Sequence, residues 1–204
     1  MPDGANHVAF AYSADGKDRF MTVHPNLNLM DGTKDFSGDW ISAGSWATDG
    51  TYKGLTVKKR TGKGPGIYKV FTAPADGTYT FSTYFKSSAK GVIVRRWVNT
   101  NGVDSAEVIN LNPDTDWTID TFSVYLKAGE KIFVRYEITS GGEGADIWTA
   151  GHKWEKGSTA TPYMPSFSEV TAEDYPSYIG TYTDNDSNEQ STDPEKYTWK
   201  KIVE

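Results

Sequence analysis

Cysteine is absent from this 204-residue sequence, which excludes disulfide bonds, thiolate metal ligands and thiol catalysis together. Long apolar runs are also absent, so neither a membrane-spanning segment nor a signal peptide is expected. The formal net charge is -6 at pH 7, which disfavours a polyanion such as nucleic acid as a partner. We therefore expect a chain that is stabilised by its apolar core, without membrane insertion and without a nucleic-acid partner.

Catalytic motifs are missing as well. The three histidines, His7, His24 and His152, stand in unrelated contexts, and none has a metal-ligand spacing to another histidine or acidic residue. No nucleophile elbow or P-loop occurs, and no carboxylate pair stands in an apolar setting that would suggest a glycosidase. The sequence therefore predicts a protein that is not an enzyme and has no cofactor.

One stretch has part of the spacing of a calcium-binding loop. Asp184, Asp186 and Asn188 occupy positions one, three and five, and Glu195 occupies position twelve. Position six is Glu189, where the sharp turn of such a loop requires glycine, and no helical pattern flanks the stretch. We interpret it as a polar hairpin loop. A structural calcium ion in the sandwich is left open, with no ligands assigned.

Aromatic residues are abundant, with 7 Trp, 12 Tyr and 9 Phe. Apolar residues alternate with period two between clusters of Gly, Asn, Asp and Pro, which is typical of a β-sandwich or barrel. Strands are predicted at 55–60, 66–72, 78–86, 92–99, 107–111, 118–126, 131–139 and 146–155. The fold class is therefore predicted as all-β, a jelly-roll sandwich of two antiparallel sheets.

The two ends of the chain differ from this central part. Each combines an aromatic strand with a polar turn, and neither can bury its apolar face alone, so we expect them to pair with each other. The predicted organisation is an N-terminal flank at 1–26, a jelly-roll module at 27–167, and a linker with a C-terminal flank at 168–204. The two flanks would form a small stem that carries the module.

Alternation along the central strands also separates core residues from outward-facing ones. The side chains expected to face outward include Tyr84, Arg95, Trp97, Tyr125, Arg135 and Glu137. Aromatic rings stack on the apolar faces of sugars, while arginine and carboxylate groups bind their hydroxyls, so these residues predict a carbohydrate-binding patch. The alternative is a set of ordinary cross-strand pairs on a solvated sheet.

A second candidate site lies in the Gly/Ser-rich stretch around Trp46, which we interpret as a loop. Trp46 beside Tyr52 at one end of a sandwich would offer another surface for stacking against sugar. Core positions are predicted for Trp40, Trp117 and Trp154. Trp148 is predicted to share a strand face with Trp154, because the two positions have the same parity.

Several segments carry a resemblance to a known family. They read "AYSADGKDRF" at 11–20, "NLNLMDGTKDFSG" at 26–38, "GTYTFSTYFK" at 77–86, "AGHKWEKGSTATPYMPSFSEVT" at 150–171 and "YIGTYTD…QSTDPEKYTWKKI" at 178–202. Together they resemble carbohydrate-binding modules in tail and baseplate proteins of siphophages that infect lactococci and related Gram-positive bacteria. The relevant proteins are of the baseplate-accessory, evolved distal tail and neck-passage types.

This resemblance implies a virion protein that recognises a polysaccharide of the host cell envelope without chemistry, next to other baseplate or tail proteins. It transfers no list of binding residues. Two alternatives remain: an accessory module of a cell-wall glycoside hydrolase, or a structural module that docks a neighbouring baseplate protein. The "SADG…YTW" pattern of the flanks favours the phage protein over the hydrolase module.

Overall fold

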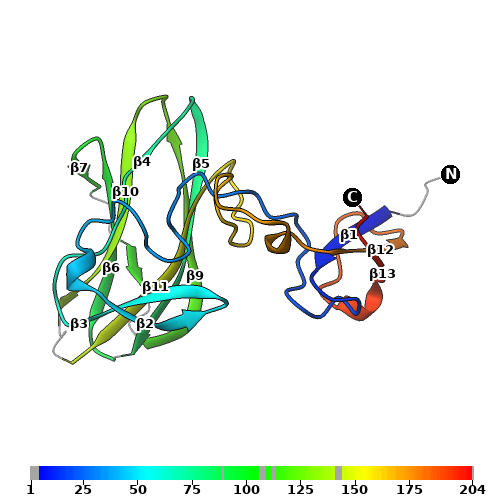
Figure 1. Cartoon of the computed structure of the whole chain (residues 1–204), viewed down its shortest axis with the longest axis horizontal. Coiled ribbons are helices and arrows are strands. Elements are labelled where there is room, and N and C mark those ends of the chain that lie inside the picture. Colours follow the sequence, from blue (N-terminus) through cyan, green and yellow to red (C-terminus); the bar gives the residue numbers. More distant parts are fainter. Residues whose placement is uncertain (1–4, 89, 106–108, 112–113, 141–143, 204) are drawn as a thin grey trace. The chain divides into compact units, whose positions relative to one another are not determined.

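The computed structural model describes residues 5–88, 90–105, 109–111, 114–140 and 144–203. The chain divides into two compact units (Figure 1): the terminal unit, Met1–Leu27 with Thr161–Glu204, and the sandwich unit, Asn28–Ala160. The described helices are short 3-10 turns: η1 (Ala43–Ser45), η2 (Ala172–Asp174) and η3 (Pro194–Lys196). No helix in the described part of the chain has the length and apolarity required to cross a membrane.

The sandwich unit consists of two antiparallel sheets (Figure 1). The first, sheet I, has the order β2 (Ala47–Tyr52), β3 (Leu55–Thr61), β11 (Asp146–Lys156), β5 (Gly77–Ser88) and β9 (Asp114–Leu126). The second, sheet II, has the order β4 (Phe71–Thr72), β10 (Lys131–Ser140), β6 (Ile93–Thr100) and β7 (Val103–Asp104), with β8 (Ile109–Leu111) also paired to β6. The predicted all-β jelly-roll sandwich is confirmed.

The core fills the space between the two sheets, and strand alternation explains its composition. Phe81 and Phe85 project inward from β5, and Tyr136 projects inward from β10, each about 1% exposed. Their ring contacts include Phe85 with Tyr136 at 5.5 Å and Phe81 with Trp154 at 5.2 Å between centroids. Such close-packed aromatic residues supply the apolar burial that a chain without disulfides needs.

A buried polar network also connects the sheets. Arg96 of β6 is 3% exposed, and its Nη1 donates to both carboxylate oxygens of Asp120 in β9 at 2.8 Å. The hydroxyl of Tyr136 donates to the same carboxylate at 2.6 Å. Burial, followed by the charge of Asp120, raises the pKa of Tyr136 well above its ordinary value. Asp120 thus joins two strands of sheet II to the edge strand of sheet I.

A β-bulge in β11 separates two tryptophans that were predicted to share a face. The register against β5 shifts between Ala150 and Lys153, and Gly151 there has a φ of 64°. Glycine adopts this left-handed conformation without a Cβ clash. Trp154 consequently enters the core at 1% exposure, as predicted, whereas Trp148 is half-buried on the outer side. The prediction that both share a face is wrong, because the extra residue reverses the alternation.

Other strand predictions need correction too. The predicted strand at 66–72 is reduced to β4, Phe71–Thr72, while β2 occupies Ala47–Tyr52 where a loop was expected. Trp117 is half-buried rather than in the core, because it shares the outer face of β9 with Ile119, which is 57% exposed. Residues 107 and 108 of the predicted strand 107–111 lie outside the described residues.

The terminal unit contains a sheet made from both chain ends, as predicted for the stem. Its order is β1 (Ala5–Ala11), β12 (Tyr178–Asp184) and β13 (Thr198–Lys201). The ring of Trp199 lies on Gly16 and Gly180, where a Cβ at Gly180 would approach the indole to 2.9 Å. Residues 161–167, predicted as part of the module, cluster with this unit. The division into a module and a stem as functional parts stays a prediction.

Candidate functional site

The outer surface of sheet II gathers four of the predicted site residues. Cross-strand pairing places Trp97 opposite Arg135 and Arg95 opposite Glu137. They face away from the core, because Val94 and its alternating neighbours point inward. We call Arg95, Trp97, Arg135 and Glu137 the arginine face.

Charged groups on the arginine face bind one another. The Nε of Arg135 donates to Oε1 of Glu137 at 3.0 Å, and its two Nη atoms donate to the carboxylate of Asp104 at 3.2 and 3.3 Å. Oε1 of Glu137 also accepts from the backbone N–H of Gly66 at 3.0 Å. Hydrogen bonds from Arg135 and then Asn99 lower the pKa of Asp104. The guanidinium of Arg135 and both carboxylates are therefore fixed in position, and Asp104 is ionised at neutral pH.

Aromatic rings adjoin these charges. The guanidinium of Arg135 lies 5.6 Å from the ring centre of Trp97 and 5.7 Å from that of Phe133. Phe133 in turn stacks on Tyr68 with centroids 3.8 Å apart and an interplanar angle of 13°. A surface that combines half-buried rings with oriented charged donors and acceptors suits a ligand that has both apolar C–H faces and hydroxyl edges.

The predicted single patch does not form, because Tyr84 and Tyr125 belong to sheet I. Tyr84 pairs with Ile119 and Ala150 in sheet I, whereas Arg95 and Trp97 belong to sheet II. The outer surfaces of two packed sheets face opposite directions. Tyr125 is 60% exposed on β9. A saccharide-binding role for Tyr125 stays a prediction.

The predicted loop platform at Trp46 is wrong. Trp46 is only 4% exposed and belongs to the core cluster. Its Nε1 donates to the carbonyl oxygen of Pro65 at 2.9 Å. The residue immediately precedes β2, so the backbone here runs along the sheet edge and turns the indole inward. The Gly/Ser-rich composition suggested an open loop, and the strand pairing that overrides it is not visible in that composition.

Tyr52, the other member of that predicted pair, lies in an aromatic cluster. It stacks on Trp117 with centroids 4.3 Å apart and an angle of 11°, and it meets Tyr84 edge-on at 5.1 Å. The Nζ of Lys53 lies 5.6 Å from the ring centre of Tyr52 and 5.4 Å from that of Tyr84. Burial raises the pKa of Tyr84, so its phenol stays protonated at neutral pH.

A further tryptophan extends this cluster along sheet I. Trp148 lies opposite Lys86 across the β11–β5 pair, and the Nζ of Lys86 lies 4.7 Å from its ring centre. The Nζ of Lys59 lies 5.5 Å from the same ring, and the indole Nε1 donates to Asp49 at 2.7 Å. We call the whole set the lysine face: Tyr52, Lys53, Lys59, Tyr84, Lys86, Trp117 and Trp148. Sequence reasoning missed both tryptophans, since it expected Trp117 in the core and the bulge hides the orientation of Trp148.

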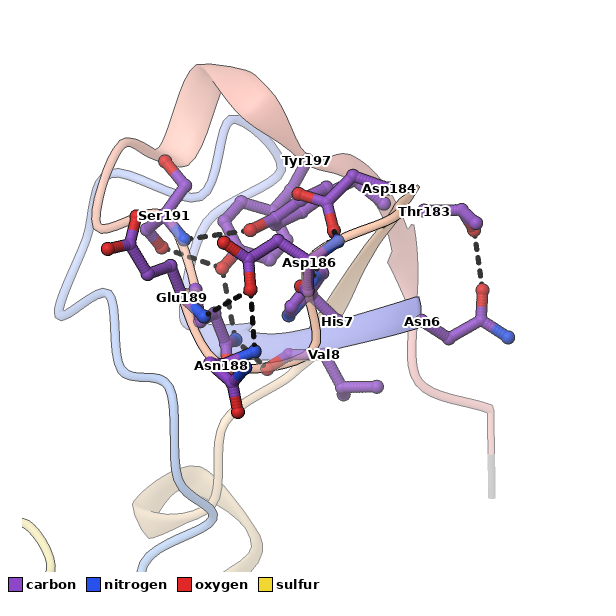
Figure 2. Close-up of polar contacts among 12 residues, drawn as sticks. Asn6, His7, Val8, Thr183, Asp184, Asp186, Asn188, Glu189, Ser191 and Tyr197 are labelled. Atoms are coloured by element: carbon purple, nitrogen blue, oxygen red, sulfur yellow. Dashed lines mark hydrogen bonds and ion pairs between the residues drawn. The ribbon is translucent and has the colours of Figure 1, made fainter. Parts of the chain in front are cut away.

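The calcium-like stretch lies in the terminal unit, between the antiparallel pair β12 and β13, and is the predicted polar hairpin loop. His7 Nε2 donates to Oδ1 of Asp184 and to the carbonyl oxygen of Asp186, both at 2.8 Å (Figure 2). Oδ1 of Asp186 accepts from the backbone N–H groups of Asn188 and Glu189 at 2.8 and 3.3 Å. The hydrogen bond from His7 lowers the pKa of Asp184. These carboxylates thus bind groups of their own unit.

Across the described ranges, no three His, Asp or Glu side chains gather closely enough to hold a metal ion. The terminal unit also has an open pocket of about 490 Å³, whose lining includes Tyr175, Pro176, Ile202 and Val203. The lining has one charged side chain, Lys201, and lacks the convergent polar groups that a hydroxyl-rich ligand requires. The two outer faces of the sandwich are therefore the better candidates.

Comparison with solved structures finds a whole-chain likeness. The tripod (BppUct-A-L) from the baseplate of bacteriophage Tuc2009 matches at 26% sequence identity with a TM-score of 0.65, over 99% of this chain and 80% of that chain. TmCBM61, solved in complex with beta-1,4-galactotriose, matches at 14% identity with a TM-score of 0.50, over 65% of this chain and 100% of that chain. At that identity the second match shows the fold alone.

No protein-family model matches the chain, and no curated protein matches it. The predicted resemblance to carbohydrate-binding modules of phage baseplate proteins is nevertheless confirmed, because the chain is similar to a phage baseplate structure and has the fold of a carbohydrate-binding module. The likeness to the Tuc2009 tripod covers the flanks as well as the sandwich, because it extends over almost the whole chain.

Proposed function

We propose that this chain is a phage baseplate or tail component that binds a saccharide of the host cell envelope and does not catalyse a reaction. The observation that carries the proposal is the likeness to the Tuc2009 baseplate tripod over 99% of the chain. The chain would act at the bacterial surface, as part of the virion, and its expected partners are an envelope polysaccharide and other baseplate or tail proteins.

The arginine face is the proposed saccharide site. The charges of Arg95 and Arg135 balance those of Glu137 and Asp104. The hydrogen bonds of Arg135 also fix its orientation, so the remaining donors and acceptors can bind sugar hydroxyls without a change of conformation. Trp97 and the stacked pair of Phe133 and Tyr68 provide apolar surface for the C–H faces of the ring. Balanced charge favours a neutral sugar here.

A cell-labelling experiment tests this proposal. The full chain, fused to a fluorescent protein, should label lactococcal or related Gram-positive cells and lose the label once their wall polysaccharide is stripped. Trp97→Ala should weaken labelling by about tenfold or more, since stacking aromatic residues contribute about 1–3 kcal/mol to binding. Phe167→Ala is the matched control, because Phe167 is 83% exposed and lies in the terminal unit.

The outcomes separate the function from the site. Labelling that survives stripping contradicts saccharide recognition and favours docking to a protein. Labelling that depends on polysaccharide but is unchanged by Trp97→Ala contradicts the arginine face as the site and leaves the function standing.

A further inference from the structure

We propose that the lysine face is a second binding site, specific for acidic saccharides that carry a carboxylate or phosphate group. It lies on sheet I and shares no residue with the arginine face of sheet II. This ligand class differs from the neutral sugar proposed for the arginine face, and it follows from a separate set of contacts.

The rings of the lysine face are placed to receive a sugar chain. Tyr84 and Lys86 stand two residues apart on the same side of β5, and they pair with Ala150 and Trp148 of β11. Ala150 is fully buried on this side, so neighbouring side chains cover it and the exposed part of the face is formed by the rings and the lysines. The ring of Tyr84 contacts Tyr52, which stacks on Trp117, and Lys86 next along the same side of β5 contacts Trp148.

The charge on this face is unlike that on the arginine face. Among the described residues, neither Lys53 nor Lys86 has a carboxylate within ion-pair distance. Lys59 has a long contact of 3.8 Å with Asp146. Asp49 also contributes a carboxylate here, because it accepts from the indole of Trp148. The three lysines therefore outnumber the two carboxylates, Asp49 and Asp146, and the ammonium groups of Lys53 and Lys86 lie against rings without an ion pair among the described residues. An anion placed between these rings would gain Coulomb energy and neutralise them.

The occupant must be small or sparsely charged. The chain as a whole carries a net charge of -6, which repels a dense polyanion such as nucleic acid at long range. A sugar with an occasional acidic group needs only one or two ammonium partners, and its C–H faces use the rings that the same face supplies. An acidic saccharide satisfies both the apolar and the charged part of this surface.

Titration calorimetry with matched probes tests the proposal on the full chain. The first pair is an oligogalacturonate and its fully methyl-esterified form; the second is a phosphorylated oligomannose and its dephosphorylated form. The acidic member of at least one pair should bind about five- to tenfold more tightly than its neutral member at low salt, as expected for two exposed charge contacts. The pair that shows the preference identifies carboxylate or phosphate as the anion.

Charge-removing variants locate the site. The double substitution Lys53→Gln with Lys86→Gln should abolish the preference for the acidic probe. Lys127→Gln with Lys131→Gln removes the same charge from two exposed lysines outside the face and should retain the preference. If the two double variants have equal thermal stability, the loss of the preference for the acidic probe does not come from a loss of folded protein.

Three results would overturn the proposal: no binding of either acidic probe, equal affinity for acidic and neutral members, or a preference that survives Lys53→Gln with Lys86→Gln. Equal binding of a decathymidylate strand would also overturn it in favour of general polyanion affinity. These results are independent of the cell-labelling result with Trp97→Ala, so either proposal can fail while the other stands.

Discussion

The outer faces of the two sheets use charge in opposite ways. On the arginine face, Arg135 is held by two carboxylates, and Glu137 is held by Arg135 and by the N–H of Gly66. On the lysine face, Lys53 and Lys86 lie over rings with no carboxylate partner among the described residues. Paired charges fix geometry and are balanced, whereas unpaired charges attract an ion. This difference in charge pairing is the basis on which different ligands are proposed for the two faces.

The largest expected effect comes from breaking the connection between the two sheets. Asp120→Ala removes the shared partner of Arg96 and Tyr136 and leaves a buried guanidinium without its carboxylate. We expect the free energy of unfolding to fall by about 3–5 kcal/mol, the typical result of breaking a buried ion pair. Denaturant unfolding measures it, with the exposed Asp39→Ala as control. A loss below about 1 kcal/mol would show that the network does not hold the sheets together.

Acid should destabilise sheet I through His152, which contacts the rings of Phe36, Trp40 and Phe81. Burial lowers the pKa of His152 from 6.5 to about 3, so the unfolded chain binds the proton first as the pH falls. Its contribution to stability is complete above about pH 6.5 and is lost progressively towards pH 3. Between pH 7 and pH 4 the loss should be about 3 kcal/mol.

The variant His152→Phe isolates this contribution from the titration of carboxylates. Its unfolding free energy, measured by denaturant titration between pH 7 and pH 4, should fall less steeply than that of the unsubstituted chain. His24→Gln, at an exposed histidine of the terminal unit, should leave the slope unchanged. Identical slopes for His152→Phe and the unsubstituted chain would refute a neutral buried imidazole.

A smaller effect is expected on the arginine face. Glu137→Ala removes two hydrogen bonds, one from Arg135 and one from the backbone of Gly66. Because both groups are only half-buried, the unfolding free energy should fall by about 1–2 kcal/mol. Affinity for neutral sugar should fall with it, since Arg135 loses one of its two anchors. Unchanged stability together with unchanged binding would contradict the rigid geometry assigned to this face.

The smallest effect is expected on the lysine face. Lys86→Ala should change the unfolding free energy by no more than about 0.5 kcal/mol. Lys86 has no ion pair within the described part of the chain, so the substitution removes a weak contact with the ring of Trp148. Thermal unfolding of Lys86→Ala and Glu137→Ala, side by side, compares the two faces directly. A loss from Lys86→Ala as large as that from Glu137→Ala would remove the proposed contrast.

Sequence alternation predicted the inward positions of the central strands but not the composition of the surfaces. The inward positions of β5, such as Tyr79, Phe81 and Phe85, follow a regular period of two and were predicted correctly. The pairing of the two chain ends was also predicted, because neither end has a partner of its own. Alternation does not say which strands share a sheet, so it could not separate Arg95 from Tyr84. Trp46 was misplaced because the contacts that bury it, including the hydrogen bond from its indole to the carbonyl oxygen of Pro65, are not visible in a Gly/Ser-rich composition.

The bulge at Gly151 has a consequence for how this surface can change over time. Trp148 before the bulge and Trp154 after it both stand at even-numbered positions of β11, yet Trp148 lies on the outer side of sheet I and Trp154 lies in the core. A substitution of Trp148 therefore changes the outer surface of sheet I, whereas the same substitution at Trp154 removes a side chain from the core. Two tryptophans on one strand thus stand under different constraints: Trp148 can be exchanged with the surface around it, and Trp154 is held by the packing of the interior.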